Sequence, residues 1–243
     1  MRRVALITGT SHGLGAALAA EFRQHGVIVA GLSRTPGTTP LDLYIPGDVT
    51  NHNDRLRALG AVDERFGRLD LLVNNAGIGI YNCWEELREE ELRAMFEVNF
   101  FAPVALTKEA LGMLRASRGT IINVSSVAGK IHLPYMGGYN ATKFALNAFS
   151  DSLRAELAPD GIHLLNLIVG RIATGFGTRP GRNDRAPKTP GIATPEAFAK
   201  ATWRAYTKRQ RELVFPSWYR PFIWVAKMVP NLYDKASLKP WRS

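Results

Sequence analysis

The sequence predicts a single α/β domain built on a doubly wound parallel sheet. Short apolar, β-branched runs alternate with longer segments of helical periodicity between residues 4 and 216, which is the pattern of repeated strand–helix–strand units. A glycine-rich turn follows the first run, as expected where a strand passes into a nucleotide-binding helix. The 243 residues, 46% of them hydrophobic, are enough to bury one large core.

Composition excludes several classes of protein. One cysteine, Cys83, rules out an intramolecular disulfide framework and fits a reducing compartment, so we expect a cytoplasmic protein. The start, Met1–Gly9, has a basic pair but only a short apolar run, which predicts a strand rather than a signal peptide. No stretch approaches the roughly 18 uninterrupted apolar residues of a spanning helix. The histidines show no ligand spacing, so no metal is expected.

The first strand, Val4-Ala-Leu-Ile7, runs into the turn Thr8-Gly-Thr-Ser-His-Gly-Leu-Gly15, and a helix follows. Glycines at these spacings permit a tight turn whose backbone N–H groups reach a pyrophosphate at a helix N-terminus. Such turns also occur for steric reasons alone, but the strand before and the helix after favour dinucleotide binding. The turn residues expected to contact the dinucleotide are Gly9, Ser11, His12, Gly13, Leu14 and Gly15.

The second strand, Val27–Leu32, ends at Ser33 and Arg34. Proteins that bind unphosphorylated NAD carry a carboxylate near this point, which bonds the ribose 2′-hydroxyl. Here no acidic residue occurs between Glu21 and Asp42, and the guanidinium of Arg34 suits a 2′-phosphate instead. NADP(H) is therefore favoured over NAD(H), with Ser33 and Arg34 as contacts. The alternative is that Arg34 is a solvated loop charge.

The segment Thr120–Leu157 joins an apolar strand to a helix that carries Tyr139 and Lys143. Positions four apart share a helix face, so we expect the ammonium beside the phenol, where it lowers the tyrosine pKa from about 10. Tyr139 would then be a usable acid or base. Ser126, at the strand end, can offer its hydroxyl to the same substrate oxygen. Alternatively these are an ordinary surface pair and a helix-capping serine. His132 is expected on a loop, with substrate contact as the alternative.

Together, the TGxxxGxG turn, the YxxxK pair and the upstream serine resemble the short-chain dehydrogenase/reductase family over residues 1 to about 215. Further family motifs follow in order. Asp48 and Val49, after the third strand, resemble its adenine contact, and Asn74-Asn-Ala-Gly77, after the strand Leu71–Val73, resembles its NNAG motif. The resemblance therefore adds the cofactor contacts Asp48, Val49, Asn75, Ala76 and Gly77.

The resemblance also implies a catalytic tetrad of Asn99, Ser126, Tyr139 and Lys143. In this scheme Ser126 and Tyr139 bond a carbonyl oxygen and Tyr139 passes the proton. Lys143 holds the nicotinamide ribose and keeps the tyrosine acidic, while Asn99 holds a water that continues a proton path to solvent.

The implied fold is a Rossmann-like sheet of about seven strands in the order 3-2-1-4-5-6-7. The implied activity is NADP(H)-dependent interconversion of a small-molecule carbonyl and a secondary alcohol. Two alternatives stay open, namely the same reaction with NAD(H), and a dinucleotide-binding regulator without turnover. Family members commonly pair through the helix that holds Tyr139 and a helix near 195–208, so a homodimer or homotetramer is expected. The basic residues match no nucleic-acid motif, so no nucleic-acid partner is expected.

After the catalytic helix, Ile162–Val169 predicts the sixth strand. The family usually has Pro-Gly next, where this chain has Val169 and Gly170. This change loosens the turn without removing a functional group, so Ile172 and Thr174 are still expected to contact the cofactor.

The following residues, 175–194, have the Gly, Pro and basic composition of a mobile flap. Their charge suits an acidic or phosphorylated substrate group, unless they form a simple solvated loop. A helix that begins near Thr194 and a seventh strand, Arg211–Pro216, complete the domain of residues 1–215.

Residues 216–243 form a basic aromatic extension. Residues 207–243 hold eight Lys/Arg against two acidic residues, a net +6 of the chain's +10. The segment Ser217–Pro230 predicts a helix, with Pro221 in its first turn and Pro230 at its end. Because this helix is apolar nearly all round, it must bury against something. It either lies in a membrane interface, where it would meet an apolar or lipid-like substrate, or packs on its own domain or a partner subunit.

Overall fold

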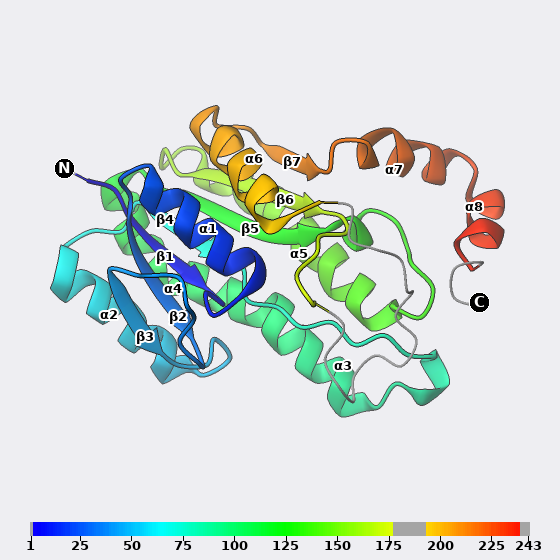
Figure 1. Ribbon diagram of the computed structural model, residues 1–243, viewed down its shortest axis with the longest axis horizontal. Coiled ribbons are helices and arrows are strands. Elements are labelled where there is room, and N and C mark those ends of the chain that lie inside the picture. The colour runs from blue at the N-terminus through cyan, green and yellow to red at the C-terminus, as the bar shows by residue number, and fades with distance from the viewer. Residues whose placement is uncertain (1, 177–192, 239–243) are drawn as a thin grey trace.

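A sheet of seven parallel strands forms the centre of the computed structural model, which describes residues 2–176 and 193–238. Its order, β3-β2-β1-β4-β5-β6-β7, confirms the predicted topology (Figure 1). The strands are β1 (Val4–Thr8), β2 (Ile28–Ser33), β3 (Leu43–Pro46), β4 (Leu71–Asn74), β5 (Thr120–Ser126), β6 (His163–Val169) and β7 (Glu212–Phe215).

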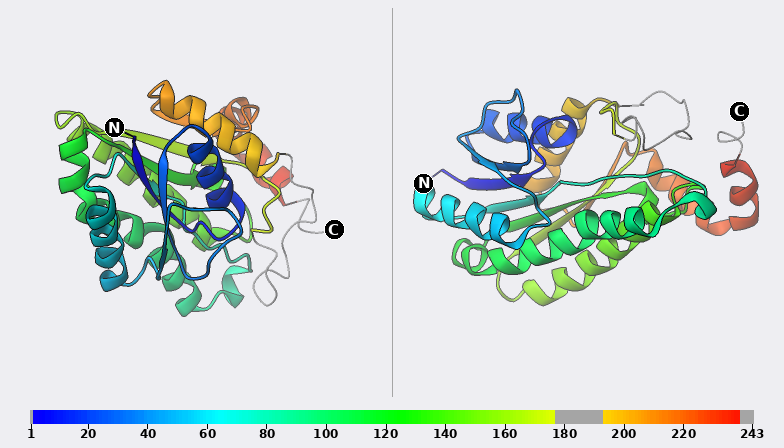
Figure 2. Two further views of the ribbon diagram at one scale, coloured as in Figure 1. Left: turned by 60° about the vertical axis from the view of Figure 1, so that its left-hand side comes forward. Right: turned by 90° about the horizontal axis from the view of Figure 1, so that it is seen from below.

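Helices cover both faces of this sheet. Figure 2 shows α1 and α6 on one side and α2, α4 and α5 on the other. The helices are α1 (Gly13–Gln24), α2 (His52–Phe66), α3 (Glu89–Phe96), α4 (Ala102–Ser117), α5 (Gly137–Leu157), α6 (Pro195–Thr207), α7 (Tyr219–Met228) and α8 (Pro230–Ser237). Three short helical turns, Trp84–Glu86, Glu97–Phe101 and Val127–Gly129, connect them.

The alternation of side chains along each strand explains why the strands read as continuous apolar runs. Ala5 and Ile7 of β1 pack with α1 and α6, whereas Val4 and Leu6 pack with α2, α4 and α5. Both sets are buried because a parallel sheet with helices on both faces leaves neither face to water. Phe22 of α1 fills the first layer, with its ring 5.2 Å from that of Trp203 on α6.

A line of buried amides crosses the central strands. Asn74, Asn123 and Asn166 occupy paired positions on β4, β5 and β6. The amide nitrogen of Asn74 donates to Oδ1 of Asn123 (2.8 Å), and Asn123 Nδ2 donates to Ser150 Oγ of α5 (2.9 Å). Asn166 Nδ2 donates to Oδ1 of Asn147, also on α5 (2.8 Å). These bonds fix the height of α5, and so of the catalytic candidates it carries, against the sheet.

The C-terminal extension differs from the prediction of a single helix, which was expected to be apolar nearly all round and to bury against something. Helix α7 begins at Tyr219 and ends at Met228, with Pro221 in its first turn, and Pro230 opens a second helix, α8, that the sequence reasoning missed. One side packs on the protein's own domain, where Tyr219, Ala226 and Tyr233 join Ile168 and Val214 in a buried cluster. The other side is exposed. Among the described residues, no helix combines the length and the apolarity needed to cross a bilayer.

Candidate active site

The glycine turn between β1 and α1 is shaped by close backbone contacts. Gly9 and Gly13 have φ of 71° and 62°, values that side chains rarely permit. A Cβ on Gly15 would lie 2.1 Å from the carbonyl oxygen of Gly9, so only glycine fits there. Asn75 clamps the turn from β4 by donating to the Thr8 and Gly9 carbonyls (2.8 and 3.2 Å).

The unpaired N–H groups and the dipole at the start of α1 give this end of the helix a partial positive charge. The first turn of α1 holds no acidic residue that would offset this charge. His12 is the residue preceding α1, and its Nδ1 lies 2.8 Å from Ser11 Oγ. The chemistry of this turn therefore fits the pyrophosphate of a dinucleotide.

The segment after β4 links this turn to the centre of the sheet edge. The backbone N–H groups of Asn75 and Ala76 both donate to Thr8 Oγ1 (3.0 Å each). A Cβ on Gly77 would lie 3.2 Å from Asn99 Oδ1 and 3.9 Å from Lys143 Nζ. The structure thus brings Asn75, Ala76 and Gly77 between the glycine turn and the catalytic candidates.

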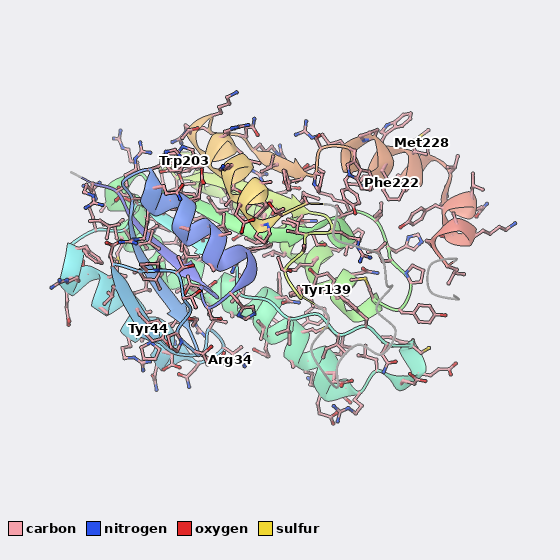
Figure 3. The ribbon with its side chains drawn as sticks, in the orientation of Figure 1. Arg34, Tyr44, Tyr139, Trp203, Phe222 and Met228 are labelled. Atoms are coloured by element: carbon pink, nitrogen blue, oxygen red, sulfur yellow. The ribbon has the colours of Figure 1, made fainter. Side chains whose placement is uncertain are left out.

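The residues predicted to contact the adenosine end gather at the ends of β2 and β3. Arg34 lies there, apart from Tyr139 on α5 (Figure 3). Its Nη1 is 3.9 Å from Asp48 Oδ2, an ion pair longer than a hydrogen bond, and 66% of its side chain is exposed. Ser33 is buried and donates to the Thr35 carbonyl (2.9 Å). Val49 is also buried, packed within the core on the α2 side.

Tyr139 and Lys143 are both buried on α5, so the alternative of an ordinary surface pair is wrong. The ammonium of Lys143 lies 5.8 Å from the centre of the Tyr139 ring and donates to the Val124 carbonyl of β5 (2.9 Å). Ser126 Oγ donates to the Val169 carbonyl (3.2 Å) and accepts from the N–H of Ala128 (3.1 Å). Ser126 therefore caps the short helical turn Val127–Gly129. Its side chain also forms a hydrogen bond with Tyr139.

The expected lowering of the tyrosine pKa does not occur in this structure. Burial raises the pKa of Tyr139 to about 12, and a hydrogen bond between Tyr139 and Ser126 opposes that rise only in part. Burial also lowers the pKa of Lys143 to about 8, because the apolar surroundings disfavour its charge. The spacing correctly predicted the shared helix face, but the loss of water around each group is the largest influence on both pKa values.

Asn99 is fully buried in a π-helical turn, Glu97–Phe101. Its Oδ1 accepts from the N–H of Ile78 (2.9 Å), and its Nδ2 donates to the Ile78 carbonyl (2.9 Å) and to Thr142 Oγ1 (3.1 Å). Thr142 in turn donates to the Tyr139 carbonyl (2.8 Å). The side chain therefore joins the segment after β4 to α5. π-Helical turns often occur at functional sites. The water expected at Asn99 stays a prediction.

Thr174 lies against the glycine turn, since a Cβ on Gly13 would be 3.4 Å from the Thr174 Cβ. Ile172 forms an isolated parallel bridge with Ala193 and packs against the core on the α1 side. Val169, where the family usually has proline, ends β6. Most of the predicted flap, residues 177–192, lies outside the described residues.

An apolar cavity of about 260 Å³ adjoins the catalytic segment. It lies between the segment that follows β4 and the residues that precede and begin α5. Its lining is largely apolar and includes Ile80, Trp84, Leu87, Leu133, Pro134 and Tyr135. His132 and Asn140 supply polar atoms to the wall. An apolar pocket of this kind suits the apolar part of a substrate.

Comparison with known proteins identifies the family of the chain. A family model described as short chain dehydrogenase matches residues 3–184. The chain belongs to the short-chain dehydrogenase family. Membership confirms the resemblance predicted from the glycine turn and the YxxxK pair, and with it the assignment of the chain to a family of dehydrogenases and reductases.

Relatives in this family carry several activities in their names. The 3-ketodihydrosphingosine reductase of Bacteroides thetaiotaomicron is 38% identical over 176 residues, which are 72% of this chain but only 65% of that protein, less than two thirds of its length. The 11-beta-hydroxysteroid dehydrogenase A of Sesamum indicum is 31% identical over 256 residues, covering 96% of this chain and 73% of that protein.

Among solved structures, an alcohol dehydrogenase from the archaeon Thermococcus sibiricus, complexed with 5-hydroxy-NADP, is 31% identical with a TM-score of 0.78. The alignment covers 88% of this chain and 96% of that one.

Sequence reasoning about this family member missed the aromatic residues around the phenol. Tyr81 packs edge-on against Tyr139, with ring centres 6.3 Å apart, and Phe176 lies 5.9 Å away. Tyr81 lies four residues after Gly77, and Phe176 lies two residues after Thr174. Aromatic residues that closely follow a predicted cofactor contact could therefore have been predicted to lie near Tyr139.

Proposed function

We propose that the protein is an NADP(H)-dependent oxidoreductase that interconverts a carbonyl and a secondary alcohol at Ser126, Tyr139 and Lys143. The observation that carries the proposal is the convergence of these three side chains, two of them buried, at the carboxyl edge of a parallel sheet beside a turn suited to a pyrophosphate. Ligands of open α/β sheets bind at this edge.

The residues present fit a dinucleotide, which would supply the hydride when bound. The glycine turn and α1 would hold its pyrophosphate. Ser33, Arg34, Asp48 and Val49 would hold the adenosine end. The nicotinamide end would lie near Asn75, Ala76, Gly77, Ile172 and Thr174, with Lys143 on its ribose.

Each catalytic side chain has a role that its surroundings support. With a pKa raised to about 12, the Tyr139 phenol is protonated at neutral pH, which is the form that donates a proton to a carbonyl oxygen during reduction. Ser126 donates a hydrogen bond to the same oxygen and stabilises its developing charge. Lys143 returns a proton toward Tyr139, and Asn99 holds the peptide segments that position both, together with the water that leads to solvent.

Cofactor preference rests on Arg34. The Arg34 side chain is largely exposed, and its guanidinium lies 3.9 Å from the Asp48 carboxylate, beyond hydrogen-bond distance. The guanidinium can therefore form bidentate hydrogen bonds to a 2′-phosphate. We expect Arg34→Ala to raise the KM for NADPH at least tenfold while the KM for NADH changes little. Arg115→Ala is a matched control, because Arg115 of α4 is also largely exposed (54%) and pairs with an aspartate, Asp160, outside the predicted cofactor contacts. Equal loss for both cofactors would instead favour an NAD(H) enzyme or a general fault in folding.

The apolar cavity supports a substrate with an apolar body attached to the reacting carbon. Two relatives named for 3-ketodihydrosphingosine and 11-beta-hydroxysteroids add support. A panel of ketones of increasing chain length should therefore show kcat/KM rising with apolar size, by up to about fourfold per buried CH₂.

Turnover is tested by NADPH oxidation with this panel. Tyr139→Phe should lose at least a thousandfold in kcat while retaining NADPH binding in a fluorescence titration, because the ring remains and only the proton donor is lost. Tyr206→Phe removes a hydroxyl on α6, where it accepts from Arg3 (3.1 Å), and serves as the control. If Tyr139→Phe leaves turnover intact, the redox assignment is wrong. If wild type binds NADPH but turns over no carbonyl, the regulatory alternative stands.

We also propose a homodimer or homotetramer that forms through α5 and α6. Phe144 of α5 is 44% exposed and Phe101, just before α4, is 50% exposed, so aromatic surface that pairing through α5 would cover is present at these two helices. Light scattering should give a mass above one chain, and Phe144→Glu should lower it. The single cysteine supports a reducing, cytoplasmic location.

A further inference from the structure

Helix α7 has an outward face composed only of apolar residues. Pro221, Trp224, Val225 and Met228 follow the i, i+3, i+4, i+7 spacing that sets residues on one side of a helix. Trp224 is 65% exposed, Val225 49% and Met228 63%. Figure 3 shows Met228 on the outer side of α7 and Phe222 on the side nearer the domain. The face is therefore turned to solvent while Tyr219 and Ala226 hold the helix to the protein.

The apolar surface continues past α7. Trp218 precedes the helix, Val229 follows it and Leu232 lies in α8, and these are 44%, 42% and 66% exposed. We call the set the α7–α8 apolar face; it comprises Trp218, Pro221, Trp224, Val225, Met228, Val229 and Leu232. Such a contiguous group on a soluble domain indicates an interaction surface.

Specific contacts fix this face in position. A Cβ on Gly170, just after β6, would lie 2.1 Å from the Tyr219 ring, so the start of α7 sits directly on the sheet edge. The Tyr233 hydroxyl of α8 donates to the His132 carbonyl (2.6 Å), and the His132 ring lies 2.7 Å from Asp234. The apolar face is thus presented by a docked element whose geometry does not depend on a partner.

Positive charge flanks the apolar face. Arg220 and Lys227, seven residues apart, share one side of α7, and Lys235 is exposed on α8. Helix α7 contains no acidic residue, and Asp234 of α8 is paired with His132. Whatever covers the face must therefore accept both apolar side chains and a positive border.

We propose that the α7–α8 apolar face docks on an anionic lipid bilayer, with α7 lying in the plane of the interface. Tryptophan and methionine would enter the boundary of the acyl chains while Arg220, Lys227 and Lys235 meet the headgroups. A second copy of the chain fits less well, since a two-fold contact would set the same basic flanks against each other. Nucleic acid would match the charge but would leave the apolar side chains without a partner.

This surface is connected to the apolar cavity. His132, which α8 holds through its carbonyl and its ring, also lines the cavity. Docking would therefore bring the cavity close to the bilayer, from which an apolar carbonyl compound could reach it. This last step rests on the proposed function, whereas docking itself does not.

Vesicle flotation of the full chain tests the proposal, with phosphatidylcholine vesicles that contain or lack phosphatidylserine. We expect wild type to float with the anionic vesicles and less with the neutral ones, and added salt to weaken the preference. Arg220→Glu with Lys227→Glu should lower the partition coefficient at least thirtyfold, since each basic residue near the surface accounts for about fivefold. Trp224→Ser with Met228→Ser should lower it at least tenfold on both kinds of vesicle.

Matched controls are available elsewhere on the surface. Leu56→Ser alters an apolar side chain of α2 that is 46% exposed, and Arg65→Glu with Lys108→Glu makes the same change of charge on α2 and α4. Both controls should float as wild type does. Circular dichroism and NADPH binding verify the fold of every variant. Quenching of tryptophan fluorescence by brominated lipid should be smaller in Trp224→Phe than in wild type, which would show that Trp224 enters the bilayer.

Three results would overturn the proposal. The first is that wild type does not float with anionic vesicles. The second is that the α2 and α4 controls lose as much binding as the α7 variants. The third is that the α7 variants lose oligomeric mass in light scattering while wild type does not bind vesicles. The last result would assign the face to a second copy of the chain. None of these measurements requires turnover, so a failure here is distinct from a failure of the redox assignment.

Discussion

Replacing Lys143 by methionine should make the cofactor-free protein more stable at neutral pH. Burial lowers the pKa of Lys143 from 10.5 to about 8, and one pKa unit corresponds to about 1.4 kcal/mol, so keeping the ammonium charged inside the fold costs about 3 kcal/mol. Methionine removes the charge and roughly keeps the volume. It also removes the hydrogen bond to the Val124 carbonyl, which contributes about 1 kcal/mol. The expected net gain is about 2 kcal/mol.

The sign of this effect reverses with pH. Because the folded-state pKa of Lys143 is below its unfolded value, the unfolded chain binds more protons between about pH 8 and 10.5, and wild type gains stability as pH rises through that window. Above it the cost has vanished, and the methionine variant should be the less stable by about 1 kcal/mol, the lost hydrogen bond.

Urea unfolding of both proteins across this pH range measures the difference directly, because titrations that they share cancel. Turnover of the variant should be lost at every pH. A difference in unfolding free energy that stays constant with pH would show that Lys143 does not titrate with a lowered pKa. A variant much less stable than wild type at neutral pH would show that the contacts of Lys143 outweigh the cost of its charge. Either result would refute the reasoning.

Four further substitutions test the packing. Gly15→Ala should abolish NADPH binding or folding, because the added Cβ would lie 2.1 Å from the Gly9 carbonyl oxygen. Gly60→Ala, with no atom within 4 Å of the added Cβ, should instead stabilise the protein by about 0.5–1 kcal/mol in urea unfolding. Similar behaviour of the two variants would contradict the close contact at Gly15. Asn123→Ala should cost about 1–3 kcal/mol in the same assay, since buried amide partners lose their bonds, and a neutral effect would contradict the amide network. Phe22→Ala should cost about 3–5 kcal/mol, and a loss below 1 kcal/mol would show that the layer between α1 and α6 collapses readily.

The order of the sheet could be predicted because it follows from local signals. Most apolar strands are separated from the next by a helical segment, with β2 and β3 joined by a loop. Direct connections between parallel strands leave few topologies once the strand before the glycine turn is assigned. The positions of Tyr139 and Lys143 on one face of α5 follow from helix geometry alone. These features depend on residues close together in the sequence.

The electrostatic state of the site could not be read in the same way. Spacing shows that Lys143 neighbours Tyr139, but whether the ammonium faces the phenol or the Val124 carbonyl depends on β5, nineteen residues away in the chain. Burial by residues from several elements then determines both pKa values. The cavity beside α5 was missed for the same reason, since its wall combines segments from before α3 and before α5.

The C-terminal helices show the limit of composition as a guide. Composition predicts that the segment beginning at Ser217 is a helix, apolar nearly all round, that must bury against something. In the structure one side meets Ile168, Val214 and Gly170, and the opposite side is exposed. Which side a helix buries is determined by the surface that receives it, and that surface is formed by strands far earlier in the sequence.

The close contact between Tyr219 and Gly170 also determines how a protein shortened at its C-terminus would behave. Cutting the protein after β7 would expose Ile168 of β6 and Val214 of β7 to water. Ile168 precedes Val169, whose carbonyl accepts the hydrogen bond of the Ser126 hydroxyl. The terminal helices are thus part of the packing of the domain itself, and a fragment that ends at residue 215 would expose apolar side chains of β6 and β7 to water.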